Sequence, residues 1–149
     1  HGHLRRFILP ALTVALGVLW QKQVCYLIHA RPGQDIDSSI GRHELWPAES
    51  SSLRLVLLAM TGAPSIAAPS LAPEVTHPLA APAEYLPQIR RFASAQVRYA
   101  DGTLSIAIPV GNPVIGAIGV SSPGLTSDRA LSIAARLRAA VYKLENPPV

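Results

Sequence analysis

The sequence has little cysteine, few aromatic residues and no long apolar run. It has 149 residues and one cysteine, Cys25, so no disulfide can form within the chain. This usage fits a reducing cytoplasm, where we expect the protein. Apolar residues make up 49% of the chain. However, Arg5, Arg6, Pro10 and Gly17 interrupt the opening segment, and no run approaches the roughly 20 apolar residues that cross a bilayer. We therefore expect no membrane association.

Charged residues are also scarce, at 15% of the chain, and the basic ones are in excess. The net charge is +4 and the isoelectric point is near 9.7, which raises the question of nucleic-acid binding. The basic residues stand singly or in pairs, such as Arg90 and Arg91, without a basic block or interleaved aromatic residues. Their distribution argues against direct binding of nucleic acid.

Signatures of catalysis and of metal binding are missing. The sequence has no nucleophile elbow, P-loop, dinucleotide fingerprint or zinc-protease motif. Cys25 and His29 have a spacing seen at metal sites, but on a strand they would lie roughly 13 Å apart, too far to share one ion. His43 and His77 are isolated. We therefore expect no enzyme activity, no metal site and no cofactor.

Hydrophobic periodicity predicts an α+β fold in which helices flank an antiparallel sheet. The expected elements are a helix end at 4–9, strands 13–20 and 24–30, helices 53–60 and 84–95, strands 103–110 and 114–121, and a helix from Thr126 or Ser127 to about 145. Five prolines between positions 61 and 82 exclude a long helix or a central strand there. Residues 1–3 look like a tag or linker remnant, 4–145 form the domain and 146–149 are a tail.

The last two expected strands carry bulky side chains on one face and small ones on the other. A three-residue turn at 111–113 would place the bulky residues together, namely Leu104, Ile106, Ile108, Val110, Val114, Gly116, Ile118 and Val120. The opposite face then carries Thr103, Ser105, Ala107, Pro109, Ile115, Ala117, Gly119 and Ser121. This second face either forms a hollow for a small ligand or is the surface against which a helix packs closely.

Three serines, Ser50, Ser51 and Ser52, stand directly before the expected helix 53–60. Hydroxyls and unpaired amides at the positive end of a helix can hold a carboxylate or phosphate. Alternatively, one serine caps the helix and the others are solvated. Next to a face of small residues, the serines favour a pocket for a small organic acid.

Several segments, in their order along the chain, resemble the effector-binding domain of IclR-type transcriptional regulators. The first hairpin of that family resembles Thr13–Trp20 with Val24–Ile28, and its turn into a leucine-alanine helix resembles Pro47–Ala59. Its paired strands resemble Ile106–Val110 and Ala117–Pro123. The sequence departs from the family where Arg54 and Leu55 replace a common Gly-Lys pair, where Ser105 replaces a frequent cysteine, and in a longer loop at 41–47.

The resemblance implies a GAF- or profilin-like domain that binds a small effector and helps the regulator form dimers or tetramers. Carried over to this sequence, the pocket comprises Ser50, Ser51, Ser52, Leu53, Ser105, Ala107, Gly119 and Ser121, and we add Trp46 and Tyr26 as apolar walls. The family's winged helix precedes this domain, so we expect DNA binding only through such a domain. The main hypothesis is a sensor of a small carboxylate, and the rival is a structural dimerisation module without a ligand.

Overall fold

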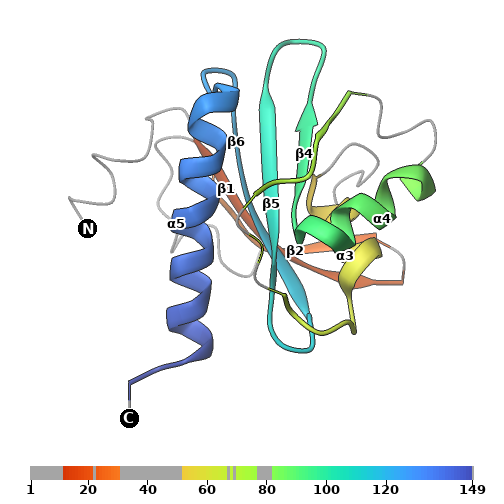
Figure 1. Ribbon diagram of the computed structural model, residues 1–149, viewed down its shortest axis with the longest axis vertical. Coiled ribbons are helices and arrows are strands. Elements are labelled where there is room, and N and C mark those ends of the chain that lie inside the picture. Colours follow the sequence, from red (N-terminus) through yellow and green to blue (C-terminus); the bar gives the residue numbers. More distant parts are fainter. Residues whose placement is uncertain are drawn as a thin grey trace.

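The computed structural model in Figure 1 describes residues 12–21, 23–30, 52–66, 68, 70–76 and 82–148. The helix end expected at 4–9 and the site residues Trp46, Ser50 and Ser51 lie outside these residues, as do His43 and His77. Within the described part, no helix is long and apolar enough to cross a membrane.

A six-stranded sheet in the order β2-β1-β6-β5-β4-β3 forms the centre of the fold. Its strands are β1 (Thr13–Trp20), β2 (Gln23–Ala30), β3 (Glu74–Val75), β4 (Ala95–Arg98), β5 (Leu104–Val110) and β6 (Gly116–Ser122). Neighbouring strands are antiparallel except β3, which pairs parallel to β4. The α+β fold expected from the sequence is confirmed. The sheet is mixed because two residues of the proline-rich segment add to its edge.

The described residues form three helices: α3 (Ser52–Met60), α4 (Pro82–Phe92) and α5 (Ser127–Glu145). Helices α3 and α4 pack on one face of the sheet and α5 packs on the other (Figure 1). The sequence predicts this helix over 84–95, with Pro87 near its start. In the structure the helix begins earlier, at Pro82, so that Pro87 lies inside it, and Ile89 packs in the core at 1% exposure. The helix ends early because Ala93, at φ +48°, leaves the helical conformation.

The strand pair β5–β6 has the predicted alternation of faces. Ile106 pairs with Val120 on the bulky face, and Ala107 pairs with Gly119 on the small face. The prediction was wrong for Val114, which precedes β6 and packs in the cluster beneath α3. The physical reason is that the connection is longer than three residues, and that Val114 exchanges backbone hydrogen bonds of 2.8 and 2.9 Å with Ala63 and Gly62 after α3.

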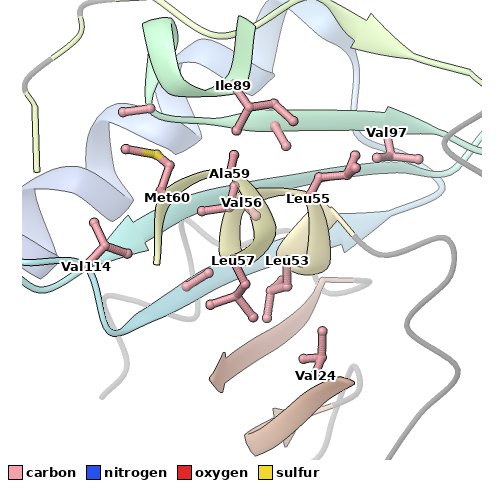
Figure 2. Packing of buried hydrophobic residues seen from close by; sticks show 14 of the residues in the cluster. Val24, Leu53, Leu55, Val56, Leu57, Ala59, Met60, Ile89, Val97 and Val114 are labelled. Atoms are coloured by element: carbon pink, nitrogen blue, oxygen red, sulfur yellow. The ribbon is translucent and has the colours of Figure 1, made fainter. Parts of the chain in front are cut away.

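Two hydrophobic cores result, one on each face of the sheet. Helix α3 is central to the first core, because Leu55, Val56 and Leu57 are at most 2% exposed although they point in different directions (Figure 2). In the sequence, Leu55 and Leu58 lie off the helical stripe formed by Leu53, Val56, Leu57 and Met60, which predicts burial on more than one side. The second core lies under α5, where Ala130 and Ala134 contact the bulky face of β5 and β6. The first core is the one that borders the predicted site.

Hydrogen bonds of Arg138 and Ser127 connect α5 to other parts of the domain. Arg138 donates hydrogen bonds to the backbone carbonyls of Ala68, Ser70 and Phe92, and its partial burial lowers its pKa. At the other end of α5, Arg98 contacts Glu74 at 2.9 Å and Ser127 donates to Glu74 at 2.8 Å.

The hydrogen bond from Arg98 lowers the pKa of the Glu74 carboxyl, and the bond from Ser127 lowers it further. The sequence offers Thr126 and Ser127 as N-cap residues of α5, and neither caps the helix through its side chain. Thr126 stands at the N-cap position without a side-chain capping bond, while the Ser127 hydroxyl is directed to Glu74.

Candidate ligand-binding site

The small side chains of three neighbouring strands form rows across the sheet. Antiparallel pairing aligns Ala15, Gly119 and Ala107 in one row of β1, β6 and β5. The next row toward the start of β1 contains Thr13, Ser121 and Ser105. The α3 face of the sheet therefore has an apolar part with little side-chain volume and, beside it, a row of hydroxyl groups.

Helix α3 approaches the apolar part closely because glycines leave room for it. A methyl carbon placed on Gly119 would lie 2.5 Å from Leu53 Cδ1, and one placed on Gly17 would lie 3.3 Å from Leu53 Cδ2. Leu53 is 4% exposed, and Ala107 is fully buried. The space above this part of the sheet is thus filled by Leu53, so a ligand reaches it only if this side chain moves.

The row of hydroxyl groups lies below the start of α3. The Oγ atoms of Ser52 and Ser105 are 2.6 Å apart in a buried hydrogen bond. Ser52 is the first residue of the helix, and its hydroxyl is directed to the sheet. Thr13 and Ser121, in the same row, are half-buried. The positive end of the helix dipole and uncharged hydroxyls thus meet at one place, a combination that suits an anion.

Tyr26 completes the group of predicted residues that the structure describes. It pairs with Gly17 in the β1–β2 ladder, so it lies on the same face, toward the edge of the sheet. Its ring packs edge-on against His29, with ring centroids 5.3 Å apart. The described site residues from α3, β2, β5 and β6 therefore all belong to the face that α3 covers.

Sequence reasoning missed the contribution of β1. Gly17 and Ala15 form part of the surface under Leu53, and Thr13 extends the row of hydroxyl groups. A glycine inside an otherwise apolar strand is a sign of close approach by another segment, so Gly17 carried a usable signal. Among the described residues, no three His, Cys, Asp or Glu side chains gather in a way that could hold a metal ion.

Several solved structures that this chain resembles in fold are transcriptional regulators. An IclR homologue from Microbacterium hydrocarbonoxydans, in complex with 4-hydroxybenzoate, is 22% identical over 89% of this chain, with a TM-score of 0.63. The repressor BlcR of Agobacterium tumefaciens is 18% identical over 95% of the chain, with a TM-score of 0.63. The chain has the fold of IclR-type regulators. Its sequence matches no protein-family model and no curated protein.

The IclR-type fold accounts for only part of the length of these regulators. The chain spans 59% of the Microbacterium protein and 61% of BlcR. It spans 87% of a C-terminal domain from Vibrio cholerae, at 18% identity and a TM-score of 0.56. The matched region is therefore consistent with the C-terminal domain of the IclR-type regulators.

Proposed function

We propose that this chain is the effector-binding part of a bacterial transcriptional regulator and that its effector is a small carboxylic acid. The observation that carries the proposal is the match over 89% of the chain to an IclR homologue in complex with 4-hydroxybenzoate. The start of α3 also supports the proposal, because the hydroxyls of Ser52 and Ser105 form a hydrogen bond there.

In this proposal the carboxylate lies at the start of α3. The amides of the first helical turn donate to it, and Ser52, Ser105 and Ser121 orient it through their hydroxyls. Ser50 and Ser51 extend the same anion site. The carbon skeleton of the effector contacts the apolar residues Leu53, Ala107, Gly119, Tyr26 and Trp46.

Binding has a regulatory effect only if the ligand prefers one arrangement of the protein. Since Leu53 fills the apolar part of the site in this structure, an effector that enters there displaces Leu53 and shifts the start of α3. We propose that this shift changes the geometry of a homo-oligomer, a dimer or a tetramer, and thereby its DNA affinity. DNA itself binds to a separate winged-helix domain, and the regulator acts in the cytoplasm without enzyme activity.

One observation favours a second function, a dimerisation module without a ligand. The hydroxyls of Ser52 and Ser105 already satisfy each other, and Leu53 already covers Gly119. If the small-residue face serves only to pack against α3, the domain needs no ligand at this place.

Thermal unfolding in the presence of carboxylic acids distinguishes the two functions. We expect 4-hydroxybenzoate or a related acid to raise the melting temperature, since a ligand at 100 times its Kd stabilises by about 2.7 kcal/mol. Ser121→Ala, at the half-buried row of hydroxyls, should reduce this shift. Ser132→Ala, on the exposed side of α5, is the matched control and should leave it unchanged. If no acid raises the melting temperature, the dimerisation module is the better account.

A further inference from the structure

We propose that Leu53 determines which effectors fit, because its side chain occupies an apolar socket that the effector's carbon skeleton must take over. This inference rests on the proposed function and goes further by naming the residue that sets specificity and the class of acid that it admits.

The socket is defined by the contacts of the two Leu53 methyl groups. Cδ1 lies over Gly119 in β6, and Cδ2 lies over Gly17 in β1. In the row of Gly119, Ala15 and Ala107 add one methyl group each and are at most 7% exposed. Since these residues supply little side-chain volume, Leu53 fills the space over Gly119, and it shares the space over Gly17 with Val24 Cγ1.

Leu53 can leave its socket more easily than its neighbour Leu57. Figure 2 shows both side chains extending from α3 toward the hairpin strand that carries Val24. Leu57 lies in the middle of the helix and is fully buried, whereas Leu53 is the second helical residue and retains 4% exposure. The end of a helix opens at a lower free-energy cost than its interior.

The socket selects for the chemistry of the effector. The rows under Leu53 contain only glycine, alanine and, at one end, Pro109, none of which has a polar side chain. A polar group placed there would lose its hydrogen bonds to water without replacement. The hydroxyls of the row next to the socket donate hydrogen bonds to the carboxylate instead. The geometry therefore fits a short acid with an aromatic or branched carbon skeleton, whose body replaces the isobutyl group of Leu53. It does not fit a dicarboxylate.

The test compares wild type with Leu53→Ala and Leu57→Ala by calorimetric titration of benzoate, 3-methylbutanoate and succinate. Leu53→Ala should bind the first two acids more tightly, by roughly tenfold for every two carbon atoms that gain a buried position. It should not gain affinity for succinate. Leu57→Ala removes the same side-chain volume one turn later and should bind no acid more tightly than wild type does.

Different outcomes separate this inference from the proposed function. If wild type binds an acid and Leu53→Ala binds it no better, or if Leu57→Ala gains as much, Leu53 does not set specificity although the sensor function stands. If no variant binds any acid, the proposed function fails and this inference fails with it. Should Leu53→Ala not fold, Leu53→Val removes less volume and should give a smaller gain for the same two acids. An unchanged preference among the acids in Leu53→Val overturns the inference.

Discussion

Gly119→Ala tests the closest contact between α3 and the sheet. The added methyl carbon would lie 2.5 Å from Leu53 Cδ1 and 2.7 Å from the backbone oxygen of Ile106. The Leu53 side chain can yield, but the backbone oxygen belongs to the neighbouring strand. Overpacking a well-packed core costs about 1–3 kcal/mol, and we expect the upper end of this range because one of the two clashes is with backbone.

A double-mutant cycle resolves the two clashes. Leu53→Ala alone should cost about 2–5 kcal/mol through the cavity that it leaves. Combined with Gly119→Ala, it removes the clash with Leu53 and leaves the one with Ile106. The double mutant should therefore be more stable than the sum of the single effects predicts, by about 1–2 kcal/mol, which is within the range for residues in contact.

Urea unfolding followed by circular dichroism measures these free energies. Gly116→Ala is the matched control. A methyl carbon there would meet the backbone oxygen of Gly17 at 3.0 Å but no atom of Leu53, so its effect should add to that of Leu53→Ala. If Gly119→Ala and Leu53→Ala also combine additively within about 0.5 kcal/mol, Leu53 does not lie on Gly119 and the description of the socket is wrong.

Substitutions at three further sites test polar contacts. Ser105→Ala leaves the buried Ser52 hydroxyl without its partner and should cost about 1–3 kcal/mol in urea unfolding, and Ser52→Ala in the same background should cost less than it does alone. Arg138→Met removes donors to three backbone carbonyls. It should destabilise by a few kcal/mol, with only weak rescue by Lys, because an ammonium lacks the planar fork of the guanidinium. Rescue to wild-type stability would show that charge alone suffices. Glu74 has a lowered pKa in the folded protein, so its stabilising effect is present above the unfolded value of 4.5 and is lost as the pH falls through the folded value. In Glu74→Gln, the loss of unfolding free energy at acid pH should be smaller than in wild type by at most about 1 kcal/mol, since the ion pair is partly exposed. An unchanged loss at acid pH would contradict this.

The face under α3 is the place to look for a ligand, because small side chains and the Ser52–Ser105 hydrogen bond lie next to each other there. The fold alone does not specify an effector. In this chain the specific features are the Ser52–Ser105 hydrogen bond and the Leu53 side chain. Experiments on these residues therefore bear on function more directly than experiments on the second core.

Local pattern predicted much of the fold. The alternation in Leu104–Val110 identified the bulky and small faces of β5, because side chains alternate along any strand regardless of its neighbours. The position of α3 followed from its apolar residues. The parallel strand β3 could not be predicted, because two residues, Glu74 and Val75, are too few to show a period. Val114 was misplaced because its hydrogen bonds reach Gly62 and Ala63, far away in the sequence.

The sequence by itself determined the periods of the main helices and strands, the separation of bulky from small side chains, and the cluster of serines before α3. Each of these depends on neighbouring residues in the chain. Only the tertiary structure decided that Leu53 fills the small-residue face over Gly17 and Gly119, and that Ser52 bonds to Ser105 across the core. These contacts join residues distant in sequence, and their distances depend on how closely a helix packs on a sheet, which no local pattern encodes.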